Sequence, residues 1–352
     1  MLRPNSRRFY ILPYVLALGI STLPPALAPP SAVAQEAPAA EPAPFFTGSP
    51  DVATFQVSAE AELQAARDAL SAMLAVQGKR TIENTLVPYN AVMTHAENAA
   101  YGSHLMESVH PDSTFRARAE ELTQRASKFI DDLSLNRPVY DALAEVDAKK
   151  ADAATRYFLF RTLQDFRLAG VDKDEATRKT ISALLDELTK TGQDFSRNIR
   201  NDSRTIQVDR VEDLAGLPED FIKAHAPGPD GKITLSIENP DYFPVIRYAQ
   251  NSEVRRRLMY EDLNRAYPAN IAVLDSLLAK RYRLARILGY PTWADYVTVD
   301  KMIGSAKNAS DFIQRLRETT FRRAQEEYAV YLKRKREDNP PATQVDKWEM
   351  SY

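Results

Sequence analysis

Apolar positions recur at helical spacing along most of the chain from Ser58 onward. The clearest segment is 172–201, where one side is apolar and the other carries Lys, Arg, Asp and Glu. Polar caps and terminating glycines divide the pattern into separate helices. We therefore predict three complete helices, over 58–78, 172–201 and 310–336. Further helices are expected to start at 81 (with an interruption near Pro88), 112, 241, 252, 270 and 292, and one more is expected to end at Gly170.

Two short runs are typical of strands instead. "TIQV" at 205–208 and "KITLSIE" at 232–238 are rich in β-branched residues and are flanked by turn residues, including "GPDG". They predict at most one short β-ribbon near 205–238 on a helical body. The predicted fold class is therefore nearly all-α, and the absence of a fixed repeat argues against a solenoid.

The first 34 residues predict a secretory signal peptide rather than part of the fold. Arg3, Arg7 and Arg8 precede a short apolar core at 11–18, and Ala32-Val33-Ala34 supplies a cleavage site. This core is shorter than the ~20 residues that a membrane span needs. We expect cleavage near Ala34 and export to the periplasm or the extracellular space. The run "SRRFYI" leaves open whether export follows the general secretory or the twin-arginine route.

Residues 35–57 predict a Pro/Ala-rich linker that stays extended. The 352 residues allow two domains or one large one. We predict a helical N-terminal region over 58–250 and the start of a second region over 251–352.

Composition excludes several functions. The net charge of −2 gives no indication of nucleic acid or an anionic membrane as a partner, so we expect neither once the signal peptide is removed. The chain has no cysteine, which excludes disulfides, thiolate nucleophiles and cysteine-ligated metal.

The four histidines do not form a recognisable metal motif. "HLMESVH", from His104 to His110, contains Glu107, but it matches neither HExxH nor HxxEH. Residues six apart on a helix point to different sides, so solvated residues at a helix end are the simpler interpretation. His95 and His225 have no partner at metal-ligand spacing, and a GxSxG elbow and Gly-rich phosphate loops are absent. The residues alone assign no catalytic, cofactor-binding or metal-ligating position.

Two later segments indicate structural joints. In "ILGYPTWADY", Gly289 is expected to end one helix and Thr292 to cap the next, with Tyr290 and Trp293 buried at the corner. In the segment 239–261, Pro244 is expected in a first helical turn. The adjacent arginines 255–257 must reach several sides of their helix, and we expect some of them to pair with buried carboxylates.

Several motifs in consistent order resemble the thimet oligopeptidase and bacterial oligopeptidase family of zinc metallopeptidases. They are "LAGLPEDFI" at 214–222, the segments 233–261 and 270–296, "DKMIGSAKNASDFI" at 300–313, and "LLDELTKTGQDFSRNIRND" at 184–202. The closing Trp348-Glu349-Met350-Ser351-Tyr352 resembles the W-D-x-x-Y stretch that members carry midway along their length. The resemblance is strongest over 184–352 and weaker back to Ser58.

This resemblance implies one multi-helix lobe of a two-lobed, channel-type metallopeptidase that cleaves short peptides. It also implies Zn²⁺ held by an HExxH motif and a downstream glutamate. All of those elements lie beyond the W-D-x-x-Y stretch in the family, so no ligand for the metal is carried over to this chain. We therefore expect an N-terminal part of an exported zinc oligopeptidase, truncated before the zinc motif and inactive alone. The alternative is a non-enzymatic periplasmic module that binds peptides or a partner peptidase.

Overall fold

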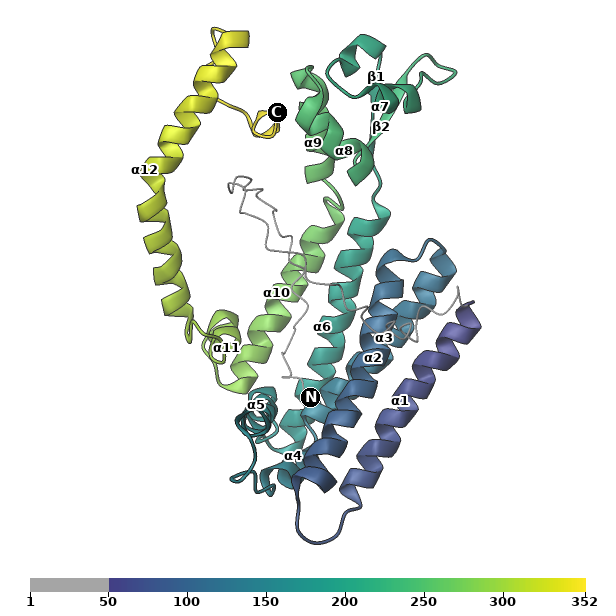
Figure 1. Cartoon of the computed structure of the whole chain (residues 1–352), viewed down its shortest axis with the longest axis vertical. Helices are drawn as coiled ribbons and strands as arrows, with labels where there is room; N and C mark the ends of the chain where they lie inside the picture. The colour runs from purple at the N-terminus through teal and green to yellow at the C-terminus, as the bar shows by residue number, and fades with distance from the viewer. Residues whose placement is uncertain (1–50) are drawn as a thin grey trace, which may run out of the picture. The chain divides into compact units, whose positions relative to one another are not determined.

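The computed structural model describes residues 51–352, and its contacts divide the chain into two units that meet at residues 186 and 187, within α6 (Figure 1). The predicted signal peptide, its cleavage near Ala34 and the predicted linker up to residue 50 lie outside the described residues. The regular secondary structure of the described part is helical except for one two-stranded ribbon, which confirms the nearly all-α fold class.

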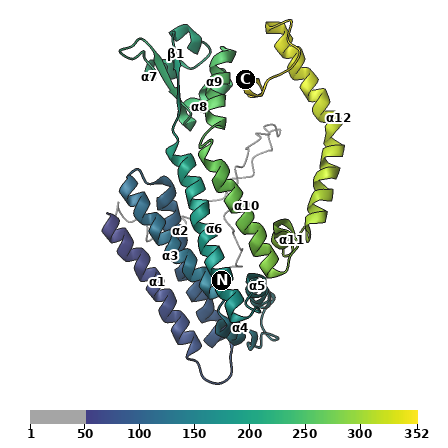
Figure 2. The same cartoon turned by 180° about the vertical axis from the view of Figure 1, so that it is seen from behind.

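The first unit is built from α1 to α5 and the beginning of α6. Helices α1, α2 and α3 lie side by side in both views (Figures 1 and 2). Their apolar sides enclose a core to which α4 and α5 also contribute, and which includes Met73, Leu86, Val92, Leu143 and Phe158. The bounds are α1 Val52–Leu74, a π-helical turn η1 Ile82–Leu86, α2 Val87–Val109, α3 Ser113–Ser134, α4 Arg137–Ala144, α5 Ala153–Ala169 and α6 Glu175–Asn201.

The second unit contains the rest of α6, the ribbon and all later helices. Strands β1 Thr205–Val208 and β2 Ile233–Ser236 are antiparallel, with Thr205 opposite Ser236 and Val208 opposite Ile233. The ribbon packs on α8 and α9 through a buried core that includes Leu235, Val245 and Leu258. The remaining bounds are η2 Val211–Leu214, α7 Glu219–Ala224, α8 Asn239–Tyr248, α9 Ser252–Leu263, α10 Ala269–Leu288, α11 Trp293–Thr298, α12 Ala306–Asp338 and η3 Lys347–Glu349.

Local sequence signals explain most helix ends. Gly170 ends α5 and Gly289 ends α10, each with φ of 97°, a left-handed conformation that glycine adopts without strain. The Thr292 hydroxyl accepts a hydrogen bond from the backbone N–H of Asp295 at 3.2 Å, as predicted for the cap of α11.

Other boundaries differ from the prediction. The first helix begins at Val52 rather than Ser58, because the Asp51 carboxylate accepts the backbone N–H of Thr54 at 2.7 Å and caps it. That helix ends at Leu74, before Gly78. The last long helix extends slightly further than predicted at both ends, from Ala306 to Asp338.

Two expectations about the joints are wrong. Pro240, not Pro244, occupies the first turn of α8, and Pro244 lies inside that helix. At the corner between α10 and α11 the buried ring is Tyr296, whereas Tyr290 and Trp293 are only half-buried.

Two helices of the second unit expose apolar stripes. On α10 the stripe consists of Ile271, Leu274, Leu278 and Tyr282, and on α12 of Ile313, Leu316, Tyr328 and Tyr331. These side chains are 38% to 64% exposed, and α12 contains no buried residue over its 33 positions. Among the described residues, no helix combines the length and the apolar character that crossing a bilayer requires.

Candidate functional site

The four histidines each contact different neighbours. His95 Nδ1 lies 2.7 Å from a carboxylate oxygen of Glu62, and His104 Nδ1 lies 3.5 Å from the buried Glu107. The His110 ring stacks on Phe115 with centroids 3.8 Å apart.

His225 lies in the second unit, directly after the end of α7. Its Nε2 is 3.0 Å from Asp241 Oδ1, and its Nδ1 is 2.8 Å from the carbonyl oxygen of Phe221. Within residues 51–352, no group of three His, Cys, Asp or Glu side chains is arranged to hold a metal ion. These residues therefore do not fit the zinc centre that the resemblance implies, and we derive no chemical step from a metal.

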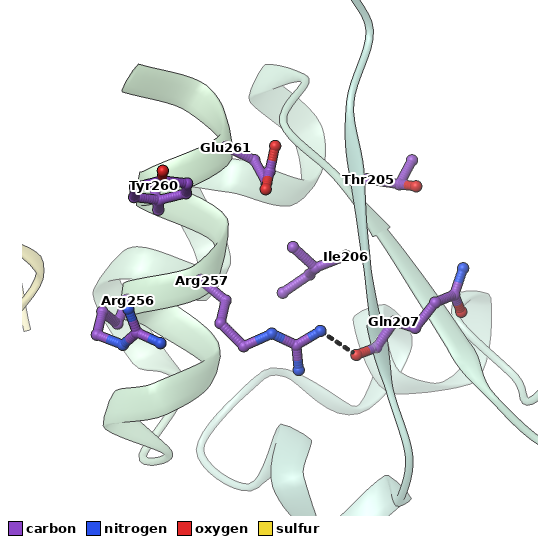
Figure 3. Close-up of a pocket in the computed structure, with 7 residues that line it drawn as sticks. All are labelled: Thr205, Ile206, Gln207, Arg256, Arg257, Tyr260 and Glu261. Atoms are coloured by element: carbon purple, nitrogen blue, oxygen red, sulfur yellow. Dashed lines mark hydrogen bonds between the residues drawn. The ribbon is translucent and has the colours of Figure 1, made fainter. Parts of the chain in front are cut away.

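A cavity lies between β1 and α9. Its volume is about 460 Å³, and it is lined by Thr205, Ile206, Gln207, Arg256, Arg257, Tyr260 and Glu261 (Figure 3). Every lining residue belongs to the second unit. We call this cavity the β1–α9 pocket.

Three adjacent arginines of α9 point to three different surroundings. Successive residues of a helix are rotated by ~100°, so Arg255, Arg256 and Arg257 cannot share one side. Arg257 donates to the backbone carbonyl of Gln207 at 2.8 Å and forms one wall of the β1–α9 pocket (Figure 3). Arg256 makes a two-pronged pair with Glu253, at 2.7 and 2.6 Å, and this carboxylate raises the pKa of Arg256.

Arg255 is buried and reaches the C-terminal segment. Its guanidinium donates to the carbonyls of Ala249 and Gln250 at the end of α8, and to Trp348 O at 3.2 Å. It also lies 4.0 Å from the ring centroid of Tyr352. Burial lowers the pKa of Arg255. The expectation that these arginines pair with buried carboxylates is wrong, because the buried one binds backbone carbonyls.

The segment 346–352 is hydrogen-bonded onto α9 and α12. The Trp348 indole donates to Ser252 Oγ at 3.0 Å. Lys335 donates to Glu349 at 2.6 Å and to Asp346 at 3.1 Å, and Asp346 and Glu349 form a reciprocal capping box around η3. Asp346 thus caps η3, which is a single 3-10 turn.

The β1–α9 pocket was not predicted from the sequence, apart from the arginine triplet. Its walls come from positions about 50 residues apart that meet only through packing of the ribbon on α9. The β-branched run at 205–208 predicts strand β1, and this is the local sequence signal for one wall of the pocket.

The sequence of the second unit matches a family of peptidases. Residues 245–352 match the model of the family described as "Peptidase family M3". The resemblance to the thimet oligopeptidase and bacterial oligopeptidase family is therefore confirmed.

Curated relatives support the same family. The chain is 23% identical to "Thimet-like oligopeptidase" of Dictyostelium discoideum, over 71% of this chain and 38% of that protein. It is 26% identical to "Saccharolysin" of Saccharomyces cerevisiae, over 66% of this chain and 34% of that protein. It is 22% identical to "Oligopeptidase A" of Haemophilus influenzae, over 77% of this chain and 42% of that protein. The chain thus spans well under half the length of these relatives.

Proposed function

We propose that this chain supplies the helical N-terminal part of an exported zinc metallopeptidase that hydrolyses short peptides. The observation that carries the proposal is the ordered similarity to oligopeptidases, including the family match over 245–352. The charged start of the sequence and the small residues ending at Ala34 support export. The sequence contains no HExxH, so the proposed chain is catalytically silent until a metal-bearing part is supplied.

The exposed stripes on α10 and α12 support a missing packing partner. Asn270 donates to Phe195 O and Lys280 donates to Thr191 Oγ1, so these side chains mark the side of α10 that meets α6. The apolar stripe on α10 begins at Ile271 and lies roughly 120° around the helix from that side. Exposed apolar surfaces of this kind commonly mark an interface. The proposed occupant is the metal-bearing part of the peptidase, which corresponds to the length of the relatives that this chain does not span.

The first test is an activity assay of the full chain with short fluorogenic peptides and added Zn²⁺. We expect no turnover, and chelator-sensitive turnover by the chain alone would refute the proposed silence. The second test adds the part of Haemophilus influenzae oligopeptidase A that follows its region of similarity. We expect a complex and chelator-sensitive cleavage only when both parts are present.

Ile313→Asp offers a matched test of the stripe on α12. The side chain is 64% exposed, so the substitution leaves the fold of the chain intact but places a charge in the proposed interface. Val330→Asp is the control, because Val330 is also 64% exposed on α12 but lies ~100° around the helix from Ile313. Loss of complex formation in both variants, or in neither, would refute the assignment of the stripe.

The alternative function is a non-enzymatic module that binds peptides, and the β1–α9 pocket is the observation that favours it. Saturable peptide binding, with no cleavage even when the metal-bearing part is added, would support this alternative over the first proposal.

A further inference from the structure

The outer edge of β1 presents backbone groups that do not pair with β2. Ile237 N donates to Arg204 O at 3.1 Å, which makes residues 204 and 237 a hydrogen-bonded pair of the ribbon. In an antiparallel pair such positions alternate, so Ile206 and Val208 also bond to β2, whereas the N–H and C=O groups of Thr205 and Gln207 point away from it. The bond from Arg257 to Gln207 O at 2.8 Å confirms this direction.

Two opposite charges flank this edge. Arg257 and Glu261 are one turn apart on α9, and Figure 3 shows the Ile206 side chain between them. Glu261 lies 3.4 Å from Arg204, whose closer partner is Asp202 at 2.9 Å. The Glu261 carboxylate is therefore only loosely engaged and about one third exposed. The pocket has a cationic end beside Gln207 and an anionic end nearer Thr205.

The backbone positions that carry these charges are about as far apart as the ends of a short zwitterion. Four residues of α-helix rise by about 6 Å, which separates the backbone positions of Arg257 and Glu261. An extended dipeptide spans about 7 Å, since each residue adds up to ~3.5 Å. The 460 Å³ cavity lies within the usual range for small-ligand sites.

We propose that the β1–α9 pocket binds the free carboxyl end of a short peptide, with a dipeptide as the smallest complete ligand. The ligand lies parallel to β1 and extends the ribbon. Its last N–H donates to Thr205 O, and its carboxylate accepts from Gln207 N–H and from the Arg257 guanidinium. For a dipeptide, the α-ammonium group lies beside Glu261. Longer peptides keep the carboxylate contacts and lose the contact with Glu261.

The test compares three dipeptide probes on the unaltered full chain: alanyl-alanine, its N-acetyl form and its C-terminal amide. Binding is followed by NMR through the amide signals of Thr205 and Gln207. We expect saturable shifts with alanyl-alanine, at least tenfold weaker binding of the amide, and several-fold weaker binding of the acetylated form. Equal binding of the amide and the free acid, or no saturable shift at these two signals, would overturn the proposal.

Substitutions assign each end of the ligand. Arg257→Gln retains a donor for Gln207 O and should remove the preference for the free acid over the amide. Glu261→Gln should remove the preference for the free amine over the acetylated form. Arg210→Gln is the matched control, because Arg210 lies shortly after β1, does not line the pocket and pairs with Asp213, and we expect both preferences to persist. If a variant fails to fold, the probe comparison on the unaltered chain still decides.

This inference does not rest on the proposed peptidase function. Dipeptide binding at β1 requires only the second unit of this chain, whereas complementation requires the stripes on α10 and α12 and an added metal-bearing part. Either can fail while the other succeeds. A preference for free carboxylates without complementation would favour the binding module. Complementation without that preference would show that the pocket does not recognise the carboxyl end of a peptide.

Discussion

The buried guanidinium of Arg255 should stabilise the attachment of the C-terminal segment to α9. Its side chain is only 3% exposed, and it donates hydrogen bonds to two carbonyls at the end of α8 and to Trp348 O. Arg255→Met keeps a side chain of similar length and apolar stem but removes every donor. The carbonyl of Ala249 then loses its side-chain donor in a buried place, and that of Gln250 loses it in a partly buried one.

The magnitude follows from these contacts. A hydrogen bond to a charged group contributes ~1.5–3 kcal/mol, and a buried carbonyl left without a donor costs ~1–3 kcal/mol. Releasing the cost of burying the charge offsets part of this loss. We expect a net decrease of about 3 kcal/mol in the free energy of unfolding. For a unit of this size each kcal/mol lowers the melting midpoint by ~2–4 °C, so the midpoint should fall by about 6–12 °C.

The assay combines calorimetry with tryptophan fluorescence. The chain has two tryptophans, so Trp293→Phe leaves Trp348 as the only reporter. In that background Arg255→Met should shift Trp348 emission to longer wavelength and expose the chain after Asp338 to proteases. Arg256→Gln is the control, because Arg256 is exposed and pairs with Glu253, and its midpoint should not change measurably. Equal midpoint shifts in the two variants, or unchanged Trp348 emission, would refute the reasoning.

Two further substitutions test the second unit. Gly216→Ala should lower the free energy of unfolding by more than ~2 kcal/mol in chemical denaturation, because Gly216 has φ of 93° and an added Cβ would overlap with Tyr248 O. Gly231→Ala is the control: Gly231 has φ of 78° but no neighbour near the added Cβ, so the loss should be only ~1 kcal/mol. A larger loss at Gly231 would contradict this. Burial raises the pKa of Asp262, so the folded state retains the proton to higher pH than the unfolded state, and stability falls as pH rises through the folded pKa. Asp262→Asn should therefore be more stable than the parent at pH 7, with the difference vanishing as pH approaches about 4, and equal melting curves at pH 7 would contradict the assignment.

The helices could be predicted because their signals are local. The left-handed glycine at the end of α10 and the threonine cap of α11 depend on neighbours within one turn. The early start of α1 was missed although Asp51 is an ordinary cap, because the Pro/Ala-rich composition before it favoured an extended linker.

The candidate site could not be predicted because its contacts are long-range. Arg257 reaches Gln207 only through the register of β1 with β2 and the packing of the ribbon on α9. The burial of Trp348 likewise depends on Ser252, 96 residues earlier. Trp348 is half-buried by this contact, whereas Tyr328 and Tyr331 on α12 are exposed.

Helix α9 places two contacts on different sides of its axis. Arg255 and Arg257 are ~200° apart around its axis. Arg255 therefore donates to the C-terminal segment, while Arg257 donates to the edge of β1. The two contacts share no side chain, and energetic effects at sites without shared partners usually add. Arg255→Met should therefore leave the preference for free-acid over amidated dipeptide unchanged, and Arg257→Gln should leave Trp348 emission unchanged. A change of either kind would show that α9 shifts as a whole, which would make attachment of the C-terminal segment and occupation of the pocket dependent on each other.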